Sequence, residues 1–177
     1  RDAVAVEFSL ENDPPFFAMG EQGKFVNIWM WKSERQADIG PGFQDIETVY
    51  PNLGIDSYPN LMQSSLEQPS RQALTLQSDP TFVTGWGAKN IVSDPERKSA
   101  VENLSAQGIG TLKANIPFDT KIQAKGIYDM DTYRVLIPRS FSREANRSVQ
   151  IKIGEIIPLA FAVWNGSKGD RGGRKSI

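Results

Sequence analysis

The residue types that could do chemistry in this chain are limited by two absences. Its 177 residues include no His and no Cys. Without Cys the chain has no disulfide, thiolate zinc site, iron–sulfur ligand or thioether-linked haem. Without His it has neither a Ser-His-Asp nor a Cys-His arrangement, and it lacks the commonest metal ligand. Any metal or cofactor would therefore be held by Met, Lys, Tyr, carboxylate or carbonyl groups.

Met19 is the first candidate ligand. It follows two phenylalanines and an alanine and precedes Gly20, so a thioether lies in an apolar turn that the backbone can approach closely. Met19 could equally pack in the core, and the residues alone leave both interpretations open. The large rings of Trp29, Trp31 and Trp164 lie in strand-like runs and serve either a core or a flat binding surface.

The other polar segments indicate structure rather than catalysis. Asp129 and Asp131 flank a predicted hairpin tip, where turn formation explains them better than acid–base catalysis does. The glycines at 166–173 do not join a strand to a helix, so they form no phosphate loop. The basic residues of 165–175 have no interleaved aromatic rings, which favours a flexible, solvated loop. A formal net charge of -1 gives no field that would attract nucleic acid or anionic lipid.

The elements that position these residues are mainly strands. Apolar runs predict strands at residues 3–8, 25–31, 121–128, 132–138, 148–153 and 156–164. The run 25–31 is apolar on both faces apart from Asn27, which predicts a strand covered on both sides. The run 159–164 is apolar throughout, which predicts a second central strand. The predicted fold class is mainly β, an antiparallel β-sandwich with one or two short helices.

One helix and one long excursion complete the predicted organisation. A helix is predicted at residues 94–108, because Asp94 can cap it, Pro95 suits its first position and Gly108 can end it. Residues 38–93 are rich in Pro, Gln, Ser and Asn and have few periodic apolar runs. We predict an irregular excursion there, within a single domain of residues 1–177, and a candidate docking surface. No segment is long and apolar enough to span a membrane.

Three ordered blocks of this sequence resemble a known family. Residues 19–32, 101–112 and 159–176 are similar to the haem b-binding gamma subunit of the periplasmic molybdoenzymes related to ethylbenzene dehydrogenase. Relatives in that family serve dimethylsulfide dehydrogenase, chlorate and selenate reductases, and nitrite oxidoreductase. The block 101–112 resembles the reductase and nitrite oxidoreductase branch most, and the two Tyr-Pro pairs of the excursion resemble its reductase-type members. Members of the family carry additional strands at both ends, so we expect these residues to be part of a longer subunit.

The resemblance implies one non-covalent haem b whose iron is held by one Met and one Lys. Met19 matches the Met position, and the Arg-Lys-Ser signature points to Lys175, with Lys32 as the fallback. Two axial ligands must approach iron from opposite sides, which is easier from two separate loops than from Met19 and Lys32, which flank a single turn and strand. Arg174 or Lys168 would neutralise the haem propionates. The full set of implied cofactor-binding residues is Met19, Lys175, Trp29, Trp31, Phe161, Trp164 and Arg174.

The resemblance also implies partners and a compartment. The chain would be an electron-transfer subunit in the periplasm or an equivalent extracytoplasmic compartment, with no substrate chemistry of its own. It would relay electrons between an iron–sulfur subunit, beside a molybdenum-cofactor catalytic subunit, and a soluble c-type cytochrome. The alternative is a haem-free carbohydrate-binding β-sandwich, in which Trp29, Trp86 and Trp164 stack on sugars. That alternative explains the aromatic residues but not the Met-Gly and Arg-Lys-Ser blocks.

Overall fold

The structure, a computed structural model, describes residues 1–15, 19–40, 50, 52, 98–115, 122–140 and 148–176. The chain divides into two compact units, Arg1–Gly42 with Lys98–Ile177, and Phe43–Arg97. Every helix and strand named below belongs to the first unit. The predicted excursion at residues 38–93 lies almost wholly outside the described residues, so its docking role stays a prediction.

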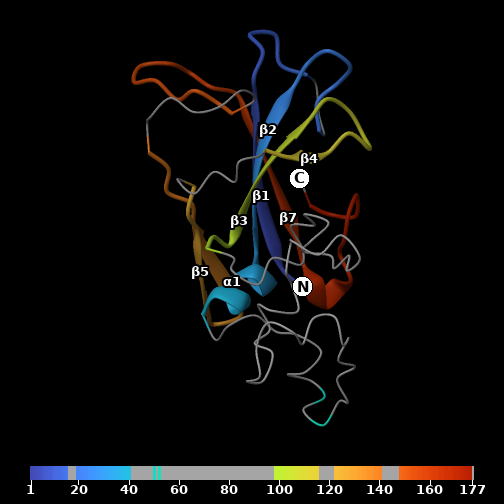
Figure 1. The fold of residues 1–177 in the computed structure, drawn as a ribbon, viewed down its shortest axis with the longest axis vertical. Coiled ribbons are helices and arrows are strands. Elements are labelled where there is room, and N and C mark those ends of the chain that lie inside the picture. Colours follow the sequence, from blue (N-terminus) through green and yellow to red (C-terminus); the bar gives the residue numbers. More distant parts are fainter. Residues whose placement is uncertain are drawn as a thin grey trace, which may run out of the picture. The chain divides into compact units, whose positions relative to one another are not determined.

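A five-stranded antiparallel sheet forms the centre of the first unit (Figure 1). Its strands, in order across the sheet, are β4 (Lys113–Ala114), β3 (Val101–Ala106), β2 (Val26–Lys32), β1 (Ala3–Ser9) and β7 (Leu159–Trp164). The strands predicted at 3–8 and 25–31 are confirmed, and β2 has a neighbour on each edge. All the pairings of these strands are antiparallel, so the predicted mainly β, antiparallel fold class is confirmed.

A two-stranded hairpin makes the second sheet of the described residues. It consists of β5 (Lys125–Asp129) and β6 (Thr132–Leu136), which pair antiparallel. Met130 and Asp131 connect them with positive φ values of 45° and 59°, which fits a two-residue turn whose twist matches that of the strands. The predicted hairpin is therefore confirmed.

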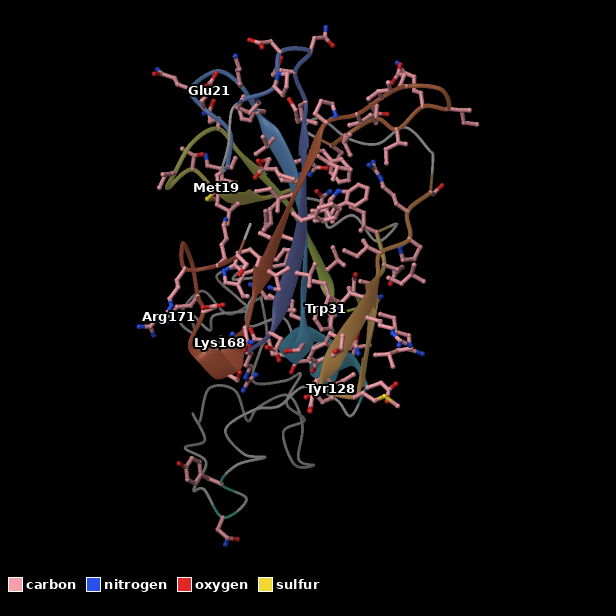
Figure 2. All side chains as sticks on the ribbon, turned by 180° about the vertical axis from the view of Figure 1, so that it is seen from behind. Met19, Glu21, Trp31, Tyr128, Lys168 and Arg171 are labelled. Atoms are coloured by element: carbon pink, nitrogen blue, oxygen red, sulfur yellow. The ribbon has the colours of Figure 1, made fainter. Side chains whose placement is uncertain are left out.

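The two faces of the five-stranded sheet carry separate cores, because successive strand residues point to opposite sides. One face is covered by the hairpin and is called the hairpin face below. Its core includes Phe8, Trp29, Trp31 and Val101, with Tyr133 and Val135 of β6 packed on them. Figure 2 shows Trp31 and Tyr128 on this side of the sheet and Met19 on the other.

The opposite face is called the alanine face below, because small side chains of β1 and β7 lie at its centre. Its buried core consists of Ala3, Ala5, Val26, Ile28, Leu104, Ala106, Ala162 and Trp164. Met19 and Met30 pack against that core. Strand pairing places Ala5 opposite Met30 on one side and opposite Ala162 on the other. On β1 and β7 the middle of this face therefore carries methyl groups, whereas β2 contributes the larger Met30 side chain beside them.

The prediction of a helix at residues 94–108 is wrong. Val101–Ala106 forms β3 instead, and all six of its residues are buried. β3 pairs with β2 on one edge and with β4 on the other, so contacts with distant parts of the chain override the local helix signals. Gly108 follows with a φ of 125° and comes after a strand rather than a helix.

A short helix, α1 (Ser33–Ile39), occurs where the sequence did not indicate one. It begins directly after β2, and its N-cap residue Lys32 makes no side-chain capping hydrogen bond. The usual start signal of a capping Ser, Thr, Asp or Asn is therefore missing at that position. Among the helices that the structure describes, none has the length and apolar character needed to cross a membrane.

Two strand predictions near the C-terminus are corrected. Residues 148–153 form no strand; Val149 is buried in the hairpin-face core, and its N–H donates to a side chain, Asn27 Oδ1, at 3.2 Å. The run 159–164 is an edge strand, β7, rather than a central one. Among the described residues, the outer edge of β7 meets an isolated bridge from Ser176 and no further strand. Phe161 lies on the face away from the alanine core and is 57% exposed.

Candidate functional site

Met19 lies at one end of the alanine face, where contacts from two strands hold its backbone. Its N–H donates to Glu7 Oε2 on β1 at 3.1 Å, and its carbonyl accepts the N–H of Gly108, just after β3, at 2.7 Å. The φ of Met19 is 66°, in the left-handed region that costs a non-glycine residue about 1–2 kcal/mol. Its half-buried side chain packs against the alanine-face core. The thioether is thus positioned by a fixed and strained backbone.

Gly20 allows the chain to turn tightly after Met19. Its φ is 75°, and a Cβ there would lie 2.6 Å from the Lys24 carbonyl oxygen and 3.1 Å from the Ala106 carbonyl oxygen. Those distances are too short for any side chain. Only glycine can therefore occupy this position without moving either the turn or the end of β3.

Lys24 closes the same turn from the solvent side. Its backbone exchanges hydrogen bonds with Glu21 at 3.2 and 2.8 Å. Its Nζ lies 2.6 Å from Asp13 Oδ2 and 2.9 Å from Glu21 Oε1. The hydrogen bond to Asp13, followed by that to Glu21, raises the pKa of Lys24 from 10.5 to about 12. Both ion pairs and backbone hydrogen bonds therefore stabilise the turn that follows Met19.

Lys175 lies at the other end of the alanine face. The next residue, Ser176, exchanges two backbone hydrogen bonds with Val163 at 2.9 and 3.0 Å, which extends the sheet by one residue beyond β7. The Lys175 Nζ lies 5.2 Å from the centroid of the Trp164 ring, and Trp164 is part of the alanine-face core. Among the residues that the structure describes, no carboxylate lies within ion-pair distance of this amine.

Lys32, the alternative lysine, has a different environment. Its Nζ lies 2.9 Å from Glu102 Oε2, and Glu102 also pairs with Arg35. Glu102 and Arg35 are both buried. The amine of Lys32 would have to leave this ion pair before it could bind a metal. Of the two candidate lysines, Lys175 is the one whose amine has no such ion pair within the described part of the chain.

The structure separates three of the predicted cofactor-binding residues from Met19 and Lys175. Trp29 and Trp31 point to the hairpin face, where both are buried, and Trp31 packs against Tyr133 with ring centroids 5.2 Å apart. Phe161 also points away from the alanine face. Successive residues of a strand point to alternate faces of the sheet. The odd-numbered residues of β2 and β7 therefore point to the hairpin face, whereas Ile28 and Trp164 point to the alanine face. Trp164 alone of the predicted aromatic residues joins the two candidate ligands.

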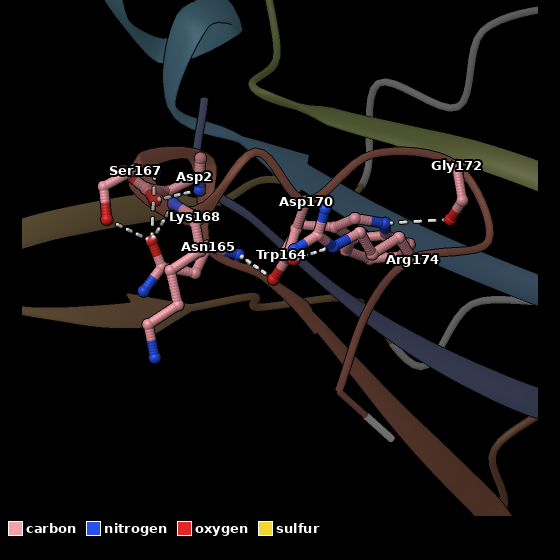
Figure 3. Close-up of polar contacts among 9 residues, drawn as sticks. Asp2, Trp164, Asn165, Ser167, Lys168, Asp170, Gly172 and Arg174 are labelled. Atoms are coloured by element: carbon pink, nitrogen blue, oxygen red, sulfur yellow. Dashed lines mark hydrogen bonds and ion pairs between the residues drawn. The ribbon is translucent and has the colours of Figure 1, made fainter.

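Side-chain hydrogen bonds link the residues of the C-terminal loop to one another (Figure 3). It contains a short 3-10 helix, η3 (Gly166–Lys168), capped by the Asn165 side chain. Trp164 Nε1 donates to the Gly172 carbonyl at 3.0 Å. The Arg174 side chain is largely exposed, with its Nε 3.5 Å from Asp170 Oδ1.

A cavity of about 330 Å³ lies beside this loop. Its wall includes Ala3, Met30, Lys32, Trp164, Asp170 and Arg171. Arg174 does not line it. Sequence reasoning missed Arg171 because spacing alone cannot rank the basic residues of an irregular segment. The described residues contain no group of three or more carboxylates that could hold a metal ion. The thioethers on this face are those of Met19 and Met30, and Met19 is the one that the family resemblance implies as a ligand.

Comparison with known proteins places this fold in a family. The chain is 32% identical over 77 residues to a protein of Haloferax mediterranei named "Putative respiratory nitrate reductase heme subunit ORF7". That match covers 43% of this chain and 27% of the relative, so the chain matches about a quarter of the relative's length. The sequence pattern of the family described as ethylbenzene dehydrogenase matches residues 1–176. Because that match spans far more than half of the sequence, the chain belongs to the ethylbenzene dehydrogenase family.

Proposed function

We propose that this chain is an electron-transfer subunit that carries one non-covalent haem b, with Met19 and Lys175 as the axial ligands. The observation that carries the proposal is the position of these two donors at opposite ends of one sheet face, with small side chains between them. Membership of the ethylbenzene dehydrogenase family supports it, as does the similarity to a protein named as a heme subunit.

The residues of the alanine face fit such a group in three respects. The methyl groups of Ala5 and Ala162 leave room beside the sheet for the apolar edge of a large planar ring. The two donors come from separate loops, so they could approach a ring from opposite sides. The amine of Lys175 has no carboxylate in ion-pair distance within the described residues, so no ion pair there competes with ligation.

Each of the surrounding residues has a definable part in this function. Glu7 fixes the backbone of Met19, and the Trp164 ring holds the Lys175 amine over the face. The apolar core of the face excludes water from the site. A haem bound by both donors would supply a one-electron iron couple and no open coordination position, which suits electron transfer rather than substrate binding. We therefore place the substrate reaction of the complex on another chain.

The proposed partners follow from the same family. The subunit would accept or donate electrons through the iron–sulfur subunit of a molybdenum-cofactor enzyme and exchange them with a soluble c-type cytochrome, in the periplasm or an equivalent compartment. The alternative of a carbohydrate-binding module lacks a supporting observation. Trp29 and Trp164 are 4% and 8% exposed, so neither presents the open ring that stacking on a sugar needs. Trp86 lies outside the described residues.

A visible spectrum of the purified, reduced protein tests the cofactor. We expect the sharp α and β bands of a low-spin haem b that is extracted by acidic solvent without covalent residue. A folded protein that remains colourless after expression in haem-replete cells and after incubation with haem would overturn the proposal.

Ligand variants test the two axial assignments. Met19→Ala and Lys175→Ala should each give a five-coordinate, high-spin spectrum or lose the haem. Two matched controls should keep the low-spin spectrum: Met130→Ala, which removes a thioether at the 90% exposed hairpin tip, and Lys152→Ala, which removes an amine from an exposed ion pair. If Lys32→Gln abolishes the low-spin spectrum while Lys175→Ala leaves it unchanged, the lysine assignment is wrong.

The electron-transfer role is tested in the assembled complex. A complex that contains the Met19→Ala subunit should lose reduction or oxidation of the cytochrome, while its substrate reaction with an artificial dye acceptor or donor persists. Equal loss of both reactions would show that this subunit does more than relay electrons.

A further inference from the structure

The cavity beside the C-terminal loop is continuous with the proposed haem site. Ala3, Met30 and Trp164, which line its wall, also belong to or pack against the alanine-face core. The Trp164 ring has the Lys175 Nζ 5.2 Å from its centroid, so the cavity and the proposed ligand share one side chain. Figure 2 shows Arg171, another residue of the wall, on the same side of the sheet as Met19. A group bound at the alanine face could therefore extend into this cavity.

The carboxylates in the cavity wall already have partners. Asp2 and Asp170 each accept a backbone N–H at 2.9 Å. Asp170 also lies 3.5 Å from Arg174, outside the cavity. Glu34 pairs with Arg1 at 3.2 Å. These contacts hold the acidic side chains in place and offset the repulsion that they would otherwise exert on a bound anion.

Arg171 is the cation of this wall whose guanidinium has no carboxylate partner within the described residues. Its backbone is nevertheless fixed, because it exchanges hydrogen bonds with Arg174 at 3.1 and 3.0 Å around a turn in which Gly172 has a φ of 55°. The wall has two further cations, Arg1, which pairs with Glu34, and Lys32. The Lys32 Nζ lies 2.9 Å from Glu102, and 28% of its side chain is exposed. The cavity thus combines a preorganised guanidinium with a half-buried ammonium.

We propose that this cavity binds the carboxylate arms of the haem, with Arg171 and Lys32 as the residues that recognise them. The inference rests on the proposed function, because it needs a haem at the alanine face. A planar guanidinium suits a carboxylate, with which it can form paired charge-assisted hydrogen bonds. The apolar ring would then contact the alanine face, and its charged carboxylate arms would lie in the cavity. Each part of the haem would thus lie in surroundings of matching polarity. Arg171 thus has the role that the family resemblance suggested for Arg174 or Lys168.

The test compares haem b with its dimethyl ester, in which both carboxylates are masked. Protein stripped of its cofactor is titrated with each compound, and the dissociation constants are measured by absorbance. Wild-type protein should bind haem b more tightly than the ester. Arg171→Gln should weaken haem b binding by about tenfold, which is typical of a lost charge-assisted hydrogen bond, and should leave ester binding unchanged. Lys32→Gln should act in the same direction.

Two further variants separate recognition from folding and overall charge. Arg171→Lys keeps the positive charge and should recover part of the affinity for haem b. Arg134→Gln removes an exposed arginine from β6, on the hairpin side of the sheet, and should change neither dissociation constant. Equal binding of haem b and its ester by the wild type, or equal weakening of both by Arg171→Gln, would overturn this inference while leaving the haem proposal intact. Failure of the wild type to bind either compound would instead overturn the proposed function.

Discussion

The Nζ of Lys32 lies 2.9 Å from Oε2 of Glu102, a carboxylate that is buried at the end of the alanine face. Arg35 occupies the other oxygen of the same carboxylate. Lys175, by contrast, faces the Trp164 ring. The two lysines that the sequence offers as ligands are therefore distinguished by their neighbours, and Lys32 is assigned to charge pairing rather than to iron.

Replacing Glu102 by Gln should destabilise the fold by about 2–4 kcal/mol, because it removes a buried carboxylate that two cations share. The free energy of unfolding is measured in urea. Glu155→Gln is the matched control: its ion pair with Lys152 at 3.0 Å is exposed, so it should cost less than about 1 kcal/mol. Equal effects of the two substitutions would mean that burial does not strengthen the Glu102 pairings.

Gly20→Ala and Gly23→Ala should differ sharply although both glycines have a positive φ, 75° and 83°. A Cβ at Gly23 meets nothing within 4 Å, whereas one at Gly20 would lie 2.6 Å from the Lys24 carbonyl oxygen. We expect Gly23→Ala to cost about 1 kcal/mol from backbone strain alone. Gly20→Ala should cost more and should also shift the Met19 backbone.

The shift of Met19 is measured by the chemical shift of its methyl group and, if haem is bound, by the low-spin bands. Gly20→Ala should change both, and Gly23→Ala should leave both as in the wild type. An unchanged Met19 methyl signal in Gly20→Ala would show that this turn does not set the position of the thioether.

Gly126→Ala should destabilise the hairpin packing by about 1–3 kcal/mol, because the added methyl group would collide with the fully buried Trp31 ring. Gly173→Ala adds a methyl group that meets nothing within 4 Å and should change stability by less than about 0.5 kcal/mol. Both are measured by chemical denaturation. Combining Gly126→Ala with Trp31→Phe, which removes the colliding part of the ring, should cost less than the sum of the single changes. Strict additivity would contradict the close contact.

Lys24 should titrate with a pKa of about 12, because Asp13 and Glu21 stabilise its charged form. The raised pKa means that these contacts favour folding fully below pH 10.5 and that their contribution is lost as the pH rises through about 12. Asp13→Asn removes the larger cause and should move the pKa back toward 10.5. NMR of the lysine side chain measures both values. An unchanged pKa in Asp13→Asn would show that Glu21 alone is responsible.

Elements with a strong local signal are the ones that could be predicted. The apolar run that becomes β2 and the Met130–Asp131 turn between two alternating segments both carry their structure in a few neighbouring residues. Residues 101–106 have no comparable strand signal, because Glu, Asn and Ser alternate poorly with their apolar neighbours. Their strand depends on pairing with β2 and β4, which is a long-range property.

For the site, the absence of His and Cys excluded imidazole and thiolate ligands. The two proposed donors, Met19 and Lys175, were predicted from the family resemblance of the Met-Gly and Arg-Lys-Ser blocks. Only the folded chain shows that Met19 and Lys175 share one sheet face. It also shows that Lys32 pairs with Glu102 and that Trp29 and Trp31 lie on the hairpin face. The physical reason is that local sequence sets which residues of a strand point the same way. What lies on that side depends on sheet register and on loops that approach from more than a hundred residues away.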